Sequence, residues 1–215
     1  MIRIVCISDT HTLHEQIELP EGDVLVHAGD FCGNGSETEA REFARWFRSC
    51  PHRYKVVVAG NHDICIEDRP ALASELFVDC TYLFDSRADV AGLRFYGAPW
   101  QPRFFDWAFN LDRGAPLREK WKLVHEGLDV LVTHGPPAGR LDRTSRDERV
   151  GCEELRTRVD IARPRVHVFG HVHEGYGTLE IGETLFVNAS TCDRAYRPVN
   201  QPIVVDLEPR PERSV

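Results

Sequence analysis

The sequence predicts an α/β domain, because short runs rich in β-branched and aromatic residues alternate with segments of helical periodicity. Several of these runs are almost entirely apolar, which is typical of strands that are covered on both faces. Polar motifs follow five of the runs directly, and α/β sheets usually place their ligands at such strand ends. The chain has 215 residues, of which 42% are hydrophobic, and this is enough for a sizeable core.

Eight strands and three helices are expected. The strands comprise residues 2–7, 24–27, 54–59, 94–96, 130–133, 166–169, 184–187 and 203–207. Ser36 and Glu39 have the spacing of a capping box, and the helix that they open carries Phe43, Trp46 and Phe47 on one face. The two further helices are expected at residues 117–124 and 153–161.

No low-complexity linker and no internal repeat interrupts the chain, so we expect one domain over residues 1–207. Residues 208–215 are rich in proline and charge and are predicted to form a short C-terminal tail. The apolar start at residues 2–7 is too short for a signal peptide, and no transmembrane segment follows it. The seven cysteines are scattered and form no Cys-x-x-Cys pair, which is typical of reduced thiols. We therefore expect a cytoplasmic protein.

The charge of the chain argues against two classes of partner. The formal net charge is −8, so nucleic acid and membrane surfaces would repel the protein as a whole. Residues 140–160 carry six arginines and six acidic residues, which indicates a mixed solvated face rather than a polynucleotide track. We expect no membrane partner and no long nucleic acid.

Five motifs, each directly after an apolar run, offer side chains that can hold a divalent cation or donate a proton. They are Asp9-Thr10-His11, Gly29-Asp30, Gly60-Asn61-His62-Asp63, His134-Gly135 and Gly170-His171-Val172-His173. Because each motif follows a different run, separate strand ends would supply one shared site.

Each motif also has a simpler interpretation. Asp9 and His11 are two residues apart, so their side chains leave on the same face if the strand continues through them; alternatively, they cap local backbone. Asp30 can bridge two cations through its two oxygens, or it can cap a turn after Gly29. His134 taken by itself is better explained as a hydrogen-bonded loop histidine than as a ligand.

The motif at residues 60–63 combines three chemically different side chains. Asn61 can give a neutral carbonyl ligand, His62 a proton, and Asp63 an acceptor that orients an imidazole; the alternative is a polar turn. The two-residue spacing of His171 and His173 directs both imidazoles to one side of an extended chain. The combination of all five motifs favours a metal site over unrelated polar turns. Carboxylate, amide and imidazole ligands without thiolate suit manganese, iron or zinc.

The ordered motifs resemble those of the calcineurin-like metallophosphoesterases over nearly the whole chain. A closer likeness, to the metallophosphoesterase-domain proteins of animal brain and their microbial relatives, rests on residues 96–100, 107–111, 133–137, 167–170, 173–177 and 188–192. The family resemblance implies a four-layer sandwich, in which a two-layer core of mixed β-sheets is flanked by helices. The subgroup is associated with metal-dependent hydrolysis of cyclic nucleotides, so the resemblance implies a phosphodiesterase that acts on 2′,3′- or 3′,5′-cyclic nucleotides.

The resemblance also implies a ligand set for two divalent ions, with manganese expected and iron or zinc as alternatives. Asp9, His11, Asp30 and His173 would hold one ion, and Asp30, Asn61, His134 and His171 the other, so that Asp30 is the bridge. Some relatives have glycine at the position of His171, whereas here the set is complete. A hydroxide shared by the two ions would attack phosphorus, with His62 protonating the departing alkoxide and Asp63 supporting His62.

The aromatic stretch at residues 100–110 bears on the substrate. Trp100 and Trp107 could stack on a nucleobase, but such loops also anchor themselves by packing or form a subunit contact in a homodimer. Arg194, Arg197 and Arg140 are candidate phosphate or base contacts, or else exposed or salt-bridged arginines. A nuclease or phosphomonoesterase acting on short nucleotides is the alternative enzyme, and a protein-interaction scaffold is the alternative outside enzymes.

Overall fold

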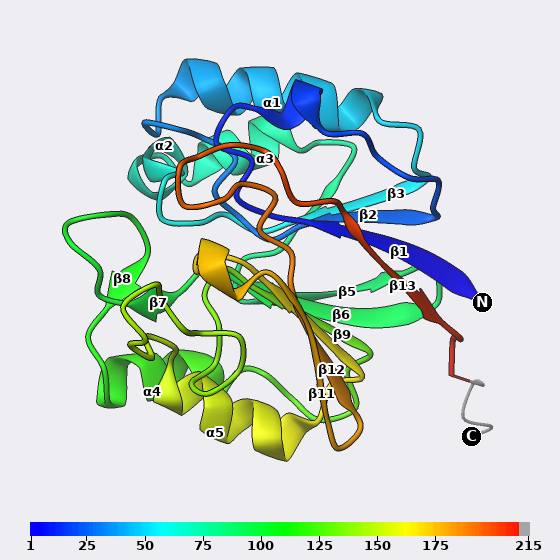
Figure 1. Cartoon of the computed structure of the whole chain (residues 1–215). Helices are drawn as coiled ribbons and strands as arrows, with labels where there is room; N and C mark the ends of the chain where they lie inside the picture. Colours follow the sequence, from blue (N-terminus) through cyan, green and yellow to red (C-terminus); the bar gives the residue numbers. More distant parts are fainter. Residues whose placement is uncertain (211–215) are drawn as a thin grey trace.

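Two β-sheets stacked face to face form the centre of the computed structural model, and helices cover both outer faces (Figure 1). The structure describes residues 1–210. This four-layer arrangement confirms the predicted fold class. None of the helices formed by residues 1–210 combines the length and hydropathy that crossing a bilayer requires.

The first sheet has the strand order β13-β1-β2-β3-β4. Strands β1 to β4 are parallel, and β13 runs antiparallel to β1 at one edge. The bounds are β1 Ile2–Ile7, β2 Val24–His27, β3 Tyr54–Val57, β4 Thr81–Tyr82 and β13 Ile203–Leu207. The predicted strand at residues 54–59 thus ends two residues early, where the chain turns toward the motif at residues 60–63.

The second sheet has the order β11-β12-β10-β9-β6-β5, with antiparallel strands at both edges of a parallel centre. The bounds are β5 Ser86–Val90, β6 Leu93–Ala98, β9 Val130–Thr133, β10 Val166–Phe169, β11 Gly177–Ile181 and β12 Thr184–Asn188. A short ribbon of β7 (Gln101–Pro102) and β8 (Asn110–Leu111) lies outside both sheets. The sequence patterns missed β5 and β11, because these edge strands carry exposed polar residues in place of an apolar run.

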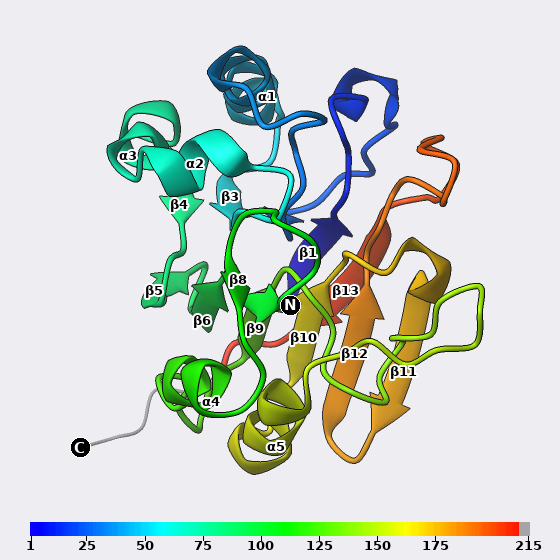
Figure 2. The ribbon, with the colours of Figure 1, turned by 90° about the vertical axis from the view of Figure 1, so that its left-hand side faces the viewer.

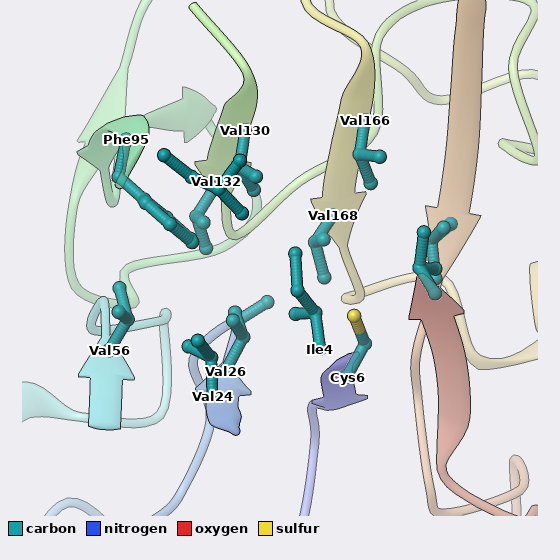
Figure 3. Close-up of a cluster of buried hydrophobic side chains, with 14 of the residues drawn as sticks. Ile4, Cys6, Val24, Val26, Val56, Phe95, Val130, Val132, Val166 and Val168 are labelled. Atoms are coloured by element: carbon teal, nitrogen blue, oxygen red, sulfur yellow. The ribbon is translucent and has the colours of Figure 1, made fainter. Parts of the chain in front are cut away.

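Alternate side chains of the central strands fill the space between the sheets. Ile4 and Cys6 of β1 face Val166 and Val168 of β10, and all four side chains are almost fully buried (Figure 3). The intervening residue Val5 points instead to the outer helical layer. Because both faces are covered, these strands are mostly apolar, with Arg3 in β1 and His167 in β10 as the exceptions, and burying each aliphatic side chain contributes about 1.5–3 kcal/mol.

Helices α1, α2 and α3 cover the first sheet, and α4 and α5 cover the second (Figure 1). Their bounds are α1 Glu37–Ser49, α2 Ile64–Asp68, α3 Ala71–Leu76, α4 Ala115–Trp121 and α5 Glu153–Ala162; short 3₁₀ turns lie at η1 His14–Gln16 and η2 His173–Gly175. The predicted capping box is confirmed, since the Glu39 N–H donates to Ser36 Oγ and the Ser36 N–H to the Glu39 carboxylate. The helix predicted at 117–124 begins and ends earlier, with Pro116 in its first turn.

The predicted tail begins with residues that lie against the second sheet. The Arg165 guanidinium donates to the Glu208 carbonyl O at 2.7 Å, and Arg210 Nε donates to the buried carboxylate of Asp129 at 2.9 Å. Residues 208–210 are therefore held beside the first residue of β9. Residues 211–215 of the predicted tail lie outside the described residues.

Acid is expected to destabilise the fold partly through His167 of β10. This imidazole is fully buried, its Nε2 lies 2.8 Å from the Thr133 hydroxyl, and burial lowers its pKa to about 3. In the unfolded chain a histidine has a pKa near 6.5, so as the pH falls the unfolded state binds the proton before the folded state does. The stability that the neutral, buried His167 contributes is therefore fully present above pH 6.5, and about 2 kcal/mol of the free energy of unfolding is lost by about pH 5. Urea unfolding at pH 7 and pH 5 measures this, and His167→Gln should show the smaller drop. Equal drops in both proteins would assign the acid sensitivity to other groups.

Candidate metal centre

The carboxyl ends of the parallel strands of both sheets lie on the same side of the molecule, and this side faces the viewer in Figure 2. Every predicted metal ligand follows one of these ends. The ligands come after β1 (Asp9, His11), β2 (Asp30), β3 (Asn61), β9 (His134) and β10 (His171, His173). An isolated bridge between Ser8 and Ser190 joins the ends of the two sheets here.

Carboxylates and imidazoles converge in three overlapping clusters whose ligand atoms lie within 4.8 Å of one another. The clusters are Asp9 with His11 and His173, Asp30 with His134 and His171, and Asp30 with His11 and His62. Asp30 Oδ2 lies 3.3 Å from His134 Nε2 and 4.0 Å from His11 Nε2, so this carboxylate faces both halves of the site. Asn61 Oδ1 lies 2.9 Å from His134 Nε2 and thereby joins the second half.

The side chains of the first and last motifs do not converge from extended strands. Strand β1 ends at Ile7, as predicted, and Asp9 and His11 have φ values of +52° and +42°, so the condition that the strand continues through both residues is not met. His171 likewise has a φ of +66°, and His173 lies in the turn η2 rather than on an extended chain. Left-handed backbone costs a non-glycine residue about 1–2 kcal/mol, so the fold stores strain at this site.

Glycines before the ligands let the motifs approach one another. A Cβ on Gly60 would collide with the Asp30 carboxylate, and one on Gly170 would collide with the carboxylate of Asp9. The His171 N–H, next to Gly170, donates to Asp9 at 3.1 Å, which ties the β10 motif to the β1 motif.

Opposite charges are paired within the site. Burial raises the pKa of Asp9, but the hydrogen bond and charge of His173 outweigh burial and hold the pKa of Asp9 well below its usual range. Burial also raises the pKa of Asp30, and there the charge and hydrogen bond of His134 outweigh burial and lower the pKa of Asp30. Burial lowers the pKa of His134 and His173, yet the partner carboxylates raise both values to about 9. Burial dominates at His171, where it lowers the pKa to about 3. The residues fit divalent cations, because buried carboxylate, amide and imidazole donors surround a hollow of about 200 Å³ without a thiolate.

Asp63 has a different role from the predicted one. Its two carboxylate oxygens accept the backbone N–H groups of Asp30 (3.0 Å), Cys32 (2.9 Å) and Gly60 (2.7 Å). The group that orients His62 is instead the Gly33 carbonyl O, 2.7 Å from Nδ1. Asp63 therefore fixes the two ligand-bearing loops to each other, and the expectation that it orients His62 is corrected. Burial and the neighbouring charge of Asp30 raise the pKa of Asp63.

Replacing Asp63 by alanine is expected to lower the free energy of unfolding by about 3 kcal/mol or more, since three buried N–H groups lose their acceptor. Urea denaturation measures the change. Asp68→Ala, at an exposed carboxylate on α2, is the matched control and should shift stability by less than about 0.5 kcal/mol. A small effect of Asp63→Ala would mean that other groups hold the two loops together.

His62 lies at the rim of the site with its Nε2 facing the hollow. Nε2 is 4.0 Å from Asp30 Oδ2, and the ring packs against Trp107 at 3.9 Å and His11 at 4.5 Å between centroids. With the Gly33 carbonyl O beside Nδ1, the proton of a neutral ring is held at Nδ1, and Nε2 is the atom open to the hollow.

The structure separates the predicted substrate contacts into two groups. Trp107 lies against His62, and Arg194 lines the hollow. Trp100 instead donates its indole N–H to Asp85 at 2.7 Å, and its ring packs against Phe109 and the Lys120 ammonium. Arg197 is 70% exposed in its side chain and pairs with Asp193. Arg140 lines a separate groove. The prediction that Trp100 and Arg197 contact the substrate is thus corrected: Trp100 packs within the fold, and Arg197 lies on the surface.

Three residues of the site were missed by the sequence patterns. Ser190 donates its hydroxyl to Asp9 Oδ2 at 2.8 Å, Tyr196 packs against His11 at 4.8 Å, and Phe104 packs edge-on against His171 at 5.6 Å. The position of Ser190 just after the β12 run was the available signal. Nothing in the local sequence distinguishes Tyr196 or Phe104 from other loop aromatics.

Comparison with known proteins identifies the family. Residues 2–175 match the family model of the calcineurin-like phosphoesterases. Metallophosphoesterase domain-containing protein 1 of Homo sapiens is 46% identical over 237 residues, which cover 99% of this chain and 72% of that protein. UPF0046 protein C25E10.12 of Caenorhabditis elegans is 39% identical over 235 residues, which cover 99% of this chain and 83% of that protein.

Solved structures show the same fold at low sequence identity. The protein TT1561 of Thermus thermophilus superposes with a TM-score of 0.64 at 13% identity, covering 95% of this chain and 98% of that one. Phosphopantetheinyl hydrolase of Mycobacterium tuberculosis superposes with a TM-score of 0.61 at 14% identity, covering 99% and 98%. The resemblance inferred from the motifs is confirmed, and the chain belongs to the calcineurin-like phosphoesterases, which are metal-dependent hydrolases.

Proposed function

We propose that this protein is a two-metal phosphodiesterase that hydrolyses small phosphodiesters, with cyclic nucleotides as the foremost substrates. The observation that carries the proposal is the position of Asp30, whose carboxylate faces two carboxylate–imidazole clusters, with His62 beside them. A site that serves two cations and keeps a proton donor next to them is suited to displacement at phosphorus.

The ligands are proposed to divide as the family pattern implies. Asp9, His11, Asp30 and His173 would hold one ion, and Asp30, Asn61, His134 and His171 the other; manganese is the proposed ion, with iron or zinc as alternatives. When bound, such a pair of cations supplies a water of lowered pKa and neutralises phosphate oxygens.

His62 is proposed to protonate the leaving alkoxide as an imidazolium: the proton on Nε2 passes to the alkoxide, and the ring is left neutral with its other proton on Nδ1. Its Nε2 faces the hollow, and the hydrogen bond from Nδ1 to the Gly33 carbonyl O fixes the ring. Trp107 covers one side of the ring. Asp63 contributes by fixing the Asp30 loop rather than by contacting His62.

The groups around the hollow support a small substrate with an aromatic part. Phe104 and Tyr196 are about half exposed and border the hollow together with Arg194, so they offer stacking faces and a cation. A second hollow of about 330 Å³ continues past Phe104 and His171 between Pro136 and Val172, and it offers room for the organic part of a diester. The net charge of −8 disfavours long nucleic acid.

A substrate panel in the presence of manganese tests the proposal. It comprises 2′,3′- and 3′,5′-cyclic nucleotides, an aryl phosphodiester, the matching monoester and short single-stranded DNA. Cleavage of the diesters with little turnover of the monoester is expected. Preferential monoester or DNA hydrolysis would replace the proposal by a phosphomonoesterase or a nuclease, and no turnover despite bound metal would favour a scaffold.

Phe104→Ala is expected to raise KM for a cyclic nucleotide by about tenfold, because its half-exposed ring lines both hollows and stacking of a base on an aromatic side chain is worth about 1–3 kcal/mol. Trp100→Phe is the matched control, since that ring packs away from the hollow and should leave KM unchanged. Steady-state kinetics measures both variants. The opposite pattern would return the substrate contact to Trp100.

Two further proposals concern the whole molecule. All seven cysteines are free thiols, which supports a cytoplasmic location that fractionation would test. Phe105 next to Phe104 is 72% exposed, which supports a contact between two copies of the chain. Sedimentation of the native protein and of Phe105→Ser measures that contact, and a monomeric native protein would exclude it.

A further inference from the structure

Helix α5 lies on the outer side of the second sheet (Figure 1). A groove of about 1010 Å³ lies beside this helix, and none of the seven proposed metal ligands lines it. Helix α5 forms one wall, and the connection at residues 138–151 forms the other. Its volume is at the upper end of the range for small-molecule pockets, about 300–1,000 Å³.

Arginines from different parts of the chain gather in this groove. Arg140 and Arg149 come from the connection, Arg156 from α5, and Arg113 from the segment before α4. Gly139, with a φ of +79°, gives two of them access to the backbone: Arg149 Nη1 and Arg156 Nη1 lie 3.1 and 3.7 Å from the point that a Cβ there would occupy. Two guanidinium groups are therefore held close together over one glycine.

The carboxylates of the groove do not form close hydrogen bonds with most of the N–H donors of these arginines. Arg149 reaches Asp142 at 3.5 Å, and Arg140 and Arg156 reach Asp160 at 3.5 and 3.6 Å. These N···O distances exceed the roughly 2.7–2.9 Å of a charge-assisted hydrogen bond. Asp142 Oδ2 is already occupied by the N–H groups of Gly139 and Gly151.

Arg140 is the most constrained of the four. Its side chain is 12% exposed and lies over the Phe186 ring, and its buried Nε has no hydrogen-bond partner in the part of the chain that the structure describes. A buried donor without an acceptor is costly. Arg113 is fixed by the carbonyls of Val150 and Gly151, so its charge is held at one end of the groove.

We infer that this groove is a binding site for a small molecule that carries a polyphosphate group. Planar guanidinium forks match phosphate oxygens, and a row of them calls for several adjacent anionic oxygens. The carboxylates of Asp142, Glu153 and Asp160 offset most of the arginine charge, so an anion with a single charge gains little, whereas a chain of phosphates contacts several forks together. This binding is separate from the metal centre and does not depend on hydrolysis there.

Calorimetric titration with inorganic tripolyphosphate tests the inference. The 215-residue chain is used in EDTA, so that no cation at the metal centre can take up phosphate. Saturable binding is expected, and Arg149→Gln and Arg156→Gln should each weaken it by about tenfold, because each variant loses one charged guanidinium fork that would bind phosphate oxygens. Both side chains are about half exposed, so folding should survive.

Arg143→Gln is the matched control, because Arg143 belongs to the same connection but pairs with Asp147 and does not line the groove. It should leave the affinity unchanged. If either glutamine variant has a lowered thermal midpoint, Arg149→Lys and Arg156→Lys replace it; these keep the charge and lose the fork, and should still weaken binding. Absence of saturable binding, an equal loss in Arg143→Gln, or citrate binding as tight as tripolyphosphate would each overturn the assignment.

Discussion

Asp30→Ala is expected to lose both metal ions and to lower kcat/KM for a diester by about a thousandfold or more. Asp30 is almost fully buried, and its carboxylate faces both His11 and His134, which belong to different halves of the site. Removing this one side chain therefore takes a ligand from each half. Metal analysis of the desalted protein after incubation with manganese measures the loss directly, independently of any substrate.

The control for this variant is Asp89→Ala, which removes an exposed carboxylate from the edge strand β5. It should bind metal like the native protein. A second readout is the titration of His134 by NMR in the metal-free protein. The Asp30 charge counteracts burial and raises the pKa of His134 to about 9, so Asp30→Ala should bring that pKa below its ordinary value of about 6.5. Full metal content in Asp30→Ala would refute the bridging assignment.

The fold was predictable because the same sequence pattern, a short apolar run, marks one buried strand after another along the chain. A strand covered on both faces is mostly apolar, and the runs at residues 24–27, 130–133 and 166–169 each have three apolar residues and one buried polar residue. Edge strands carry a weaker pattern, since one side meets solvent. Strands β5 and β11 were missed for that reason.

The members of the site were predictable, but their roles were less so. Residues of metal-binding type that follow parallel strands can be expected to share one site, because the carboxyl ends of parallel strands lie at the same edge of the sheet. They do not reveal hydrogen bonds to backbone N–H groups, which decide what Asp63 does. Trp100 and Trp107 lie in one aromatic stretch, yet only Trp107 contacts His62, because the distinction depends on tertiary partners such as Asp85.

His62→Ala is expected to keep both metal ions and to lose about 10²- to 10⁴-fold in kcat on a diester with a poor alkoxide leaving group, the usual contribution of a general acid. His62 is outside the proposed ligand set, and its Nε2 lies 4.0 Å from Asp30 while facing the hollow. The same variant should lose little on an aryl diester, since a good leaving group departs without a proton. The leaving-group dependence thus separates proton donation from a structural role.

Metal analysis of His62→Ala distinguishes the two remaining explanations of a rate loss. His62 also belongs to a cluster with His11 and Asp30, so an imidazole that served as a ligand would reveal itself by reduced metal content. Retained metal with an equal rate loss on both substrates would point to a general disturbance of the Gly33 loop, to which His62 Nδ1 is bonded. Full activity on the poor-leaving-group diester would remove the proton-donor assignment. Only retained metal together with a loss that grows with the basicity of the leaving group assigns the proton to Nε2.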